Sequence, residues 1–158
     1  MSVPFLHMFR SKSKIQSKKD TANLVNAQAW PLSMIGSDGP KMITFAVMGL
    51  GDAAPRRPGI FIYARKTHTQ DWQALYIGES ANLQSRLAFN EIAADALLSG
   101  ATDIHILQLD TDASIRRDLC EQLIRTNHPP LNDEQRRRLA PTPTTAPQTT
   151  QKGRTRAA

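Results

Sequence analysis

The sequence has only one cysteine, Cys120, among its 158 residues, and it has no long run of apolar residues. One cysteine excludes an internal disulfide framework and any zinc site built from several cysteines. The longest run without a charged or strongly polar residue covers nine residues, 43–51, whereas a membrane-spanning helix needs about 20. We therefore expect no membrane-spanning segment, a reducing cytoplasmic compartment, and a buried Cys120 that is not a nucleophile.

Acidic residues are missing from both ends of the chain. Residues 1–19 hold five lysines and arginines, residues 136–158 hold six, and neither stretch contains Asp or Glu. The intervening residues 20–135 hold nine basic and 14 acidic side chains, which gives them a net charge of −5. Basic ends of this kind suit sequence-independent contact with the phosphate backbone of DNA. The alternative is that they only keep a small protein in solution.

Large apolar residues are also missing from the last part of the chain, residues 141–158. We expect this stretch to be disordered, because it cannot bury enough apolar surface to offset the entropy of ordering. Residues 1–29 are mostly polar and basic apart from the apolar segment 3–9, which we interpret as a docking segment for a protein partner or a fragment of amphipathic helix. The expected organisation is a basic, largely flexible arm (1–40), one folded domain (41–134) and a basic, Pro/Thr-rich disordered tail (135–158).

Patterns of strand and helix follow one another from residue 42 to residue 127. Runs rich in β-branched and aromatic residues predict strands, and apolar residues spaced four apart predict helices. The expected strands are 42–48, 60–64, 72–77 and 103–109, and the expected helices are 81–90, 91–98 and 112–127. This order predicts an α+β domain with a small antiparallel sheet of about three to four strands flanked by helices. We expect 60–64 to pair antiparallel with 74–77, and 103–109 to join the same sheet.

Five short elements occur in a fixed order within these predicted strands and helices. They are Gly59-Ile60-Phe61, Tyr76-Ile77-Gly78, Arg86 ten residues after Tyr76, Glu121, and Asn132 after a Pro-Pro-Leu run. Over roughly residues 58–133 this arrangement resembles the GIY-YIG nuclease superfamily. The resemblance implies a metal-dependent endonuclease, a hydrolase that cleaves phosphodiester bonds in DNA.

The resemblance also implies a role for each matching residue. Arg86 would contact the scissile phosphate, Glu121 would bind Mg²⁺ or Mn²⁺, and Asn132 would position the site. A motif tyrosine, Tyr76 or the nearby Tyr63, would serve as the general base or assist it. The chemistry needs these residue types, because phosphodiester hydrolysis requires an activated water and stabilisation of the charge that develops on the phosphoryl oxygens.

Two positions depart from the family pattern. The first motif reads Gly-Ile-Phe instead of Gly-Ile-Tyr, so the side chain of Phe61 carries no hydroxyl. Tyr63 is two residues further along and is expected on the same face of the strand, about 6–7 Å away. Several members of the family have a histidine four residues after the arginine, where this chain has Asn90.

Each candidate residue also has a structural interpretation. Glu121 lies four residues from both Arg117 and Arg125 and would form a surface ion-pair ladder on a helix. Asn132 would cap a short helix from Asp133 to Leu139. Arg86 would be a solvated helix charge and Tyr76 a half-buried strand residue, and His105 is expected to be structural rather than catalytic.

Three functions are therefore compatible with the sequence. The first is the endonuclease. The second is a catalytically impaired module of the same fold that binds nucleic acid. The third is a protein-interaction adaptor that docks on its partner through the apolar segment 3–9.

Overall fold

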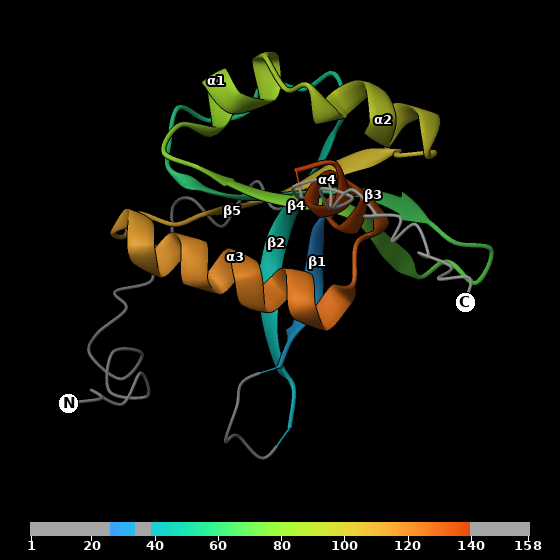
Figure 1. Cartoon of the computed structure of the whole chain (residues 1–158), viewed down its shortest axis with the longest axis horizontal. Coiled ribbons are helices and arrows are strands. Elements are labelled where there is room, and N and C mark those ends of the chain that lie inside the picture. The colour runs from blue at the N-terminus through green and yellow to red at the C-terminus, as the bar shows by residue number, and fades with distance from the viewer. Residues whose placement is uncertain (1–25, 34–38, 140–158) are drawn as a thin grey trace, which may run out of the picture.

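The computed structural model describes residues 26–33 and 39–139, which form five strands and four helices. In chain order they are β1 (Ala27–Leu32), β2 (Lys41–Gly49), β3 (Gly59–Lys66), β4 (Trp72–Ser80), α1 (Leu83–Ala88), α2 (Ile92–Leu98), β5 (Asp103–Gln108), α3 (Ala113–Asn127) and α4 (Pro130–Leu139) (Figure 1). No helix in these described ranges has both the length and the apolar character needed to cross a membrane.

The five strands form one antiparallel sheet in the order β1-β2-β5-β3-β4. This confirms the expected α+β class with helices flanking a small sheet. The predicted pairing of 60–64 with 74–77 is confirmed, because Ile62 lies opposite Ile77 and Tyr63 opposite Tyr76. The strand at 103–108 joins the same sheet, between β2 and β3.

The sheet has one strand more than expected, because β1 lies within residues 1–40, which the sequence assigned to the arm. Its sequence, Ala-Gln-Ala-Trp-Pro-Leu, contains no β-branched residue and therefore carries little strand signal. Pro31 is tolerated because β1 is an edge strand. Trp30 and Leu32 are buried in the core, so the folded domain includes Ala27–Leu32 and does not begin at residue 41.

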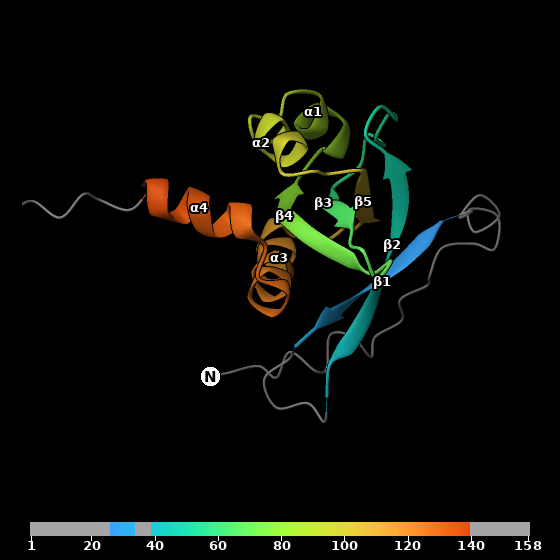
Figure 2. The ribbon, with the colours of Figure 1, turned by 90° about the vertical axis from the view of Figure 1, so that its right-hand side faces the viewer.

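The two faces of the sheet are covered by different helices. α3 packs on one face, where its Leu119 and Leu123 join Ile60 and Ile62 of β3 in one buried cluster. α1 and α2 lie over the opposite face (Figure 2), where a second cluster contains Phe61 of β3. The alternation of side chains along β3 therefore sends the residues of the first motif into two separate cores.

α4 lies beside β4, the edge strand at the other side of the sheet, and extends away from it (Figure 2). It begins at Pro130, where proline is favourable because the first helical residues have no intrahelical partner for their N–H groups. Two expectations change as a result. Asn132 lies within the first turn and is not the cap of a helix at 133–139, and the expected domain boundary at residue 134 falls inside α4. The apolar segment 3–9 and residues 140–158 lie outside the described residues.

Candidate active site

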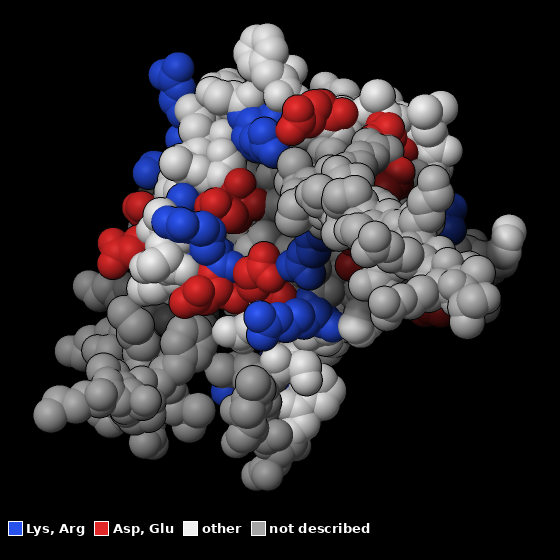
Figure 3. All heavy atoms as spheres, viewed as in Figure 1, with Lys and Arg blue, Asp and Glu red and all other residues white. Residues whose placement is uncertain are grey.

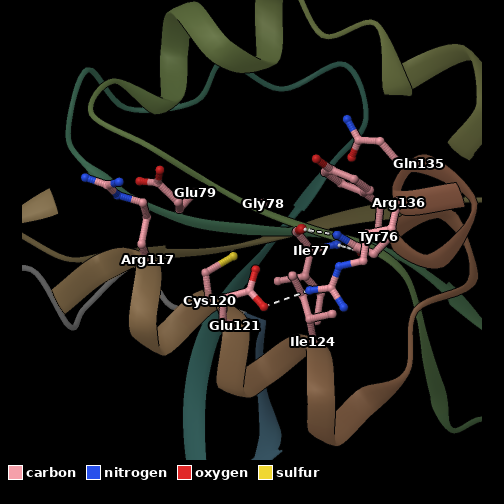
Figure 4. A pocket seen from close by; sticks show the side chains of 11 residues that line it. Tyr76, Ile77, Gly78, Glu79, Arg117, Cys120, Glu121, Ile124, Gln135 and Arg136 are labelled. Atoms are coloured by element: carbon pink, nitrogen blue, oxygen red, sulfur yellow. Dashed lines mark hydrogen bonds and ion pairs between the residues drawn. The ribbon is translucent and has the colours of Figure 1, made fainter. Parts of the chain in front are cut away.

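A cavity of about 340 Å³ lies where β4, α3 and α4 meet. Its lining includes all three residues of the second motif, together with side chains from both helices (Figure 4). The lining residues are Tyr76, Ile77, Gly78, Glu79, Arg117, Cys120, Glu121, Ile124, Asn132, Gln135 and Arg136. The cavity therefore joins three of the five sequence-predicted candidates: Tyr76, Glu121 and Asn132.

The pairing of Tyr76 with Tyr63 places both side chains on the α1–α2 side of the sheet. A β-bulge follows directly, because the next residue of β3, Ala64, pairs with Ala74, so Leu75 has no partner on β3. Leu75 and Tyr76 consequently pack into the same core cluster, although neighbouring strand residues normally face opposite sides.

Arg86 of α1 approaches the phenol of Tyr76 and is linked to the cavity through it. Burial raises the pKa of Tyr76 above its usual value of 10, and the charge and hydrogen bond of Arg86 act in the opposite direction. Burial likewise raises the pKa of Tyr63, against the smaller effects of a hydrogen bond from Asn90 and the charge of Arg86. Both tyrosines are therefore neutral at pH 7; Arg86 favours the ionisation of Tyr76, and Asn90 together with Arg86 favours that of Tyr63.

Tyr63 does not line the cavity that contains Tyr76 and Glu121. It lines a second cavity of about 320 Å³ between α1, α2 and the loop after β2. There Asn90 donates a hydrogen bond from Nδ2 to the Tyr63 hydroxyl at 3.5 Å. Asn90, at the position of the family histidine, thus contacts Tyr63, which is the cross-strand partner of Tyr76.

Phe61, the departure in the first motif, is fully buried and lines neither of these cavities. Its ring centroid lies 6.0 Å from those of Tyr63 and Tyr76. The ring occupies the space above Gly78, where a Cβ atom would lie 2.5 Å from Cζ of Phe61. The glycine of the second motif is therefore required by close packing, and the Phe61 side chain fills the core instead of presenting a polar group.

Glu121 lies on the exposed side of α3, and its ion pair crosses to α4. Nη2 of Arg136 donates to Oε2 of Glu121 at 2.7 Å, and both side chains are 51% exposed (Figure 4). Among the described residues, this is the only ion pair recorded for Glu121, so the expected ladder with Arg117 and Arg125 is not seen. Arg136, which the sequence assigned to the basic tail, belongs to the site.

A second glutamate, Glu79, directly follows the second motif and lines the same cavity. Nε of Arg116 donates to its Oε2 at 2.6 Å, and the two side chains are 6% and 26% exposed respectively. Arg116 also donates to the backbone oxygen of Thr111. This pair ties the end of β4 to the start of α3.

Asn132 binds the edge of the sheet as a neighbouring strand would. Its Oδ1 accepts from the backbone N–H of Ile77 and its Nδ2 donates to the carbonyl oxygen of Ile77, both at 2.8 Å. Both backbone groups of this edge residue are thereby paired, which buried backbone requires. Asn132 fixes α4, and with it Arg136, against the second motif.

Sequence reasoning missed Glu79, Gln135 and Arg136 as lining residues. Glu79 had a usable signal, because it directly follows Tyr76-Ile77-Gly78 on the same strand. No sequence signal indicates the tertiary position of Arg136, because that position depends on the hydrogen bonds of Asn132 to β4. Among the described residues that Figure 3 shows, cationic and acidic side chains are intermixed on this face, so those residues form no broad positive surface.

His105 and Cys120 are buried as expected. Nδ1 of His105 accepts from Nε1 of Trp30 at 2.9 Å, and burial lowers the pKa of His105 to about 4. Burial, aided by the charges of Glu121 and Glu79, raises the pKa of the Cys120 thiol to about 12. A thiol of that pKa is not a nucleophile at neutral pH.

The side chains at the cavity fit an ion that keeps most of its waters, and they do not form a metal site with several protein ligands. The described residues contain no group of three or more Asp, Glu, His or Cys side chains placed to hold a metal. Mg²⁺ binds through as few as one or two carboxylates because it keeps several of its waters. The half-exposed carboxylate of Glu121 meets this requirement, although one of its oxygens already binds the guanidinium of Arg136.

Comparison of the chain with models of protein families, with curated proteins and with solved structures finds no match. The interpretation of the site therefore depends on the residues and geometry described above.

Proposed function

We propose that the chain is a metal-dependent endonuclease that hydrolyses phosphodiester bonds in DNA, in the manner implied by the resemblance to the GIY-YIG nuclease superfamily. The observation that carries the proposal is the convergence of Tyr76, Glu121 and Asn132 on one cavity, with Arg86 beside Tyr76. Arg86, Glu121 and Asn132 are 10 to 56 positions from Tyr76 in the sequence, and the resemblance to the nuclease superfamily links the same residues independently of the fold.

Each residue has a distinct part in this proposal. Arg86 binds the scissile phosphate and stabilises the negative charge that develops on its oxygens. In its phenolate form, which the positive charge of Arg86 favours, Tyr76 accepts the proton of the attacking water. Asn132 is a positioning residue, because it acts through the backbone of β4.

Glu121 is the proposed ligand for Mg²⁺ or Mn²⁺. When bound, such an ion supplies Lewis-acid stabilisation of the phosphate and of the leaving oxygen. Arg136 must leave Oε2 of Glu121, or share it, before an ion can bind there. The basic ends of the chain are proposed to contact the DNA backbone, and the lone buried cysteine fits a cytoplasmic location.

The direct test is cleavage of linear, supercoiled and branched DNA with Mg²⁺ or Mn²⁺. We expect Glu121→Ala to abolish metal-dependent cutting, because the metal loses the only carboxylate that the motif provides. Asp118→Ala is the matched control, since Asp118 is an exposed acid on the same helix that does not line the cavity. Cutting by Glu121→Ala at the wild-type rate would overturn the proposal.

The pH dependence of the rate tests the role of Tyr76. The pKa of Tyr76 is raised above 10, so its basic form becomes more abundant as the pH rises from 7 to 9. We expect the rate to increase over this range, and we expect Tyr76→Phe to be about 10²–10⁴-fold slower with a flat profile. Tyr63→Phe is the comparison, because Tyr63 lines the other cavity.

The second candidate function is a nucleic-acid-binding module that does not cut. It is favoured by the neutral tyrosines, the buried Phe61 and the pairing of Glu121 with Arg136. Absence of cutting on all three forms of DNA, together with DNA binding that weakens steeply as the salt concentration rises, would favour this module over the nuclease.

A further inference from the structure

The cavity between α1 and α2 has an apolar character that differs from that of the candidate active site. Its lining is dominated by aliphatic side chains, with Tyr63 at its wall and Asp52 at the loop after β2. The aliphatic lining residues are Leu50, Ala53, Ala54, Leu87, Ala88, Ala93, Leu97 and Ile104. We call this cavity the apolar groove.

Exposed apolar side chains flank the apolar groove. Phe89 is 87% exposed and Leu98 is 88% exposed, and each directly follows a residue that lines the groove. Leu97, itself a lining residue, is 53% exposed. Exposed apolar side chains beside an apolar cavity are typical of a binding surface, whereas single ones need no explanation.

The described chain begins at the same end of the sheet as the apolar groove. The carbonyl of Asn26 accepts from the backbone N–H of Val47, three residues before Leu50 of the groove. Asn26 and Asp103 line one cavity together, and the next residue, Ile104, lines the groove. Asn26, the first residue that the structure describes, therefore lies at the same end of the sheet as the groove, on the other face.

We propose that the apolar groove binds the apolar segment 3–9 of the same chain. This segment holds Val3, Phe5, Leu6, Met8 and Phe9. Large apolar side chains of this kind would cover the aliphatic lining of the groove and the exposed Phe89 and Leu98. Sixteen residues lie between Phe9 and Asn26, and a flexible coil of this length spans about 22 Å.

Charge does not oppose this occupant. Residues 1–19 carry five positive charges and no negative one, and residues 27–139, which include the arginines of α4, hold 12 basic and 13 acidic side chains. Binding in the groove would cover Tyr63 but would leave the cavity of Glu121 open, so this inference stands apart from the proposed nuclease activity.

Limited digestion of the full chain with chymotrypsin tests the proposal, because the enzyme cleaves after the Phe and Leu residues of the segment 3–9. Cleavage follows the undocked population when docking is fast. We expect the Phe89→Ser/Leu98→Ser double variant to be cut within residues 5–9 about tenfold faster than the wild type. Both side chains are almost fully exposed, so the variant should keep the wild-type melting temperature.

Met42→Ser is the matched control, because Met42 is 58% exposed and lies on β2 at the end opposite the groove. We expect it to be cut at the wild-type rate. Equal cleavage of the wild type and the double variant would overturn the proposal. Protection that disappears on dilution would also overturn it, because the groove would then hold the arm of a second copy.

A second measurement uses the other partner of the contact. In methyl NMR spectra of the full chain, Phe5→Ser/Phe9→Ser should shift the signals of Leu87 and Leu97 but not that of Leu119, which packs on the opposite face. Unchanged signals for Leu87 and Leu97 would show that the segment 3–9 lies elsewhere.

Discussion

Two glutamates line the same cavity, and each is paired with an arginine, but the two pairs differ in burial. In the pair of Glu79 with Arg116, the side chains are 26% and 6% exposed, whereas Glu121 and Arg136 are each 51% exposed. The donor–acceptor distances are nearly the same, 2.6 and 2.7 Å. The difference therefore lies in the surrounding solvent and not in the geometry of the contact.

Burial decides what each pair can do. Removing one partner of a buried pair leaves an uncompensated charge, so such a pair is hard to separate and suits a structural role. An exposed pair contributes little and separates easily, because water replaces either partner. Of the two carboxylates in the cavity, Glu121 is the one that can release its arginine and bind a metal ion or another partner.

The largest expected effect is on the buried pair. Arg116→Gln should lower the free energy of unfolding by about 3–5 kcal/mol, because the carboxylate of Glu79 stays in the cavity without its partner. Urea unfolding, with the midpoint and slope fitted together, measures this change.

Glu79→Gln/Arg116→Met is the informative control for that experiment. It removes both charges, so it should be less destabilising than Arg116→Gln alone. If Arg116→Gln costs under 1 kcal/mol, the two pairs are energetically alike and the comparison fails.

Local sequence patterns were sufficient for most of the fold. The pairing of β3 with β4, the position of α3 and the membership of β5 in the same sheet followed from alternation and helical spacing. β1 was missed because its six residues carry little β propensity, and its pairing with β2 and the burial of Trp30 and Leu32 define it.

The candidate site was only partly predictable, because its geometry depends on tertiary contacts. The bulge at Leu75 is a property of two paired strands, and no pattern within β4 shows which residue lacks a partner. The pairing of Glu121 with Arg136 instead of a residue on its own helix follows from the anchoring of α4 by Asn132. The five motif elements indicate candidate site residues, and the fold determines which side chains these residues contact.

His105 extends the comparison to a buried group for which the described part of the chain provides no counter-charge within ion-pair distance. Its pKa in the folded state is about 4, below the usual 6.5, so the unfolded state binds a proton first as the pH falls. Stability should therefore be lost between about pH 6.5 and pH 4, by about 3 kcal/mol in total.

The test is to measure unfolding free energies at pH 7 and pH 4. His105→Asn should lose about 3 kcal/mol less than the wild type between these two values, since it has no imidazole to protonate. His68→Asn is the control, because His68 is exposed. An identical pH dependence for wild type and His105→Asn would mean that His105 is not the group responsible.

Asn132 connects the comparison to the fold, because it holds the helix that carries Arg136. Asn132→Ala leaves the N–H and carbonyl of Ile77 without these partners and should cost about 2–3 kcal/mol. Hydrogen exchange at the amide of Ile77 should also become faster. Gln135→Ala is the control on the same helix. A loss of stability without faster exchange at Ile77 would mean that Asn132 stabilises the protein in some way other than through its bonds to the backbone of Ile77.

The smallest expected effect on stability, and the most informative for function, is at the exposed pair. Arg136→Gln should change the free energy of unfolding by less than about 1 kcal/mol. It should also raise the affinity of Glu121 for Mn²⁺ by up to about fivefold, because the ion no longer competes with a guanidinium for Oε2. Electron paramagnetic resonance of free Mn²⁺ measures this affinity without any need for DNA cutting.

Arg137→Gln is the matched control for that measurement. Arg137 is the next residue on α4, and its Nε donates only to the backbone oxygen of Asp133 among the contacts recorded for the described residues. It should leave Mn²⁺ binding unchanged, and Glu121→Gln should abolish the binding that Arg136→Gln strengthens. An affinity that stays the same or weakens in Arg136→Gln would mean that Arg136 supports the ion instead of competing with it. Arg136 would then hold the Glu121 carboxylate in place for the ion, as Arg116 holds the carboxylate of Glu79 in the folded structure.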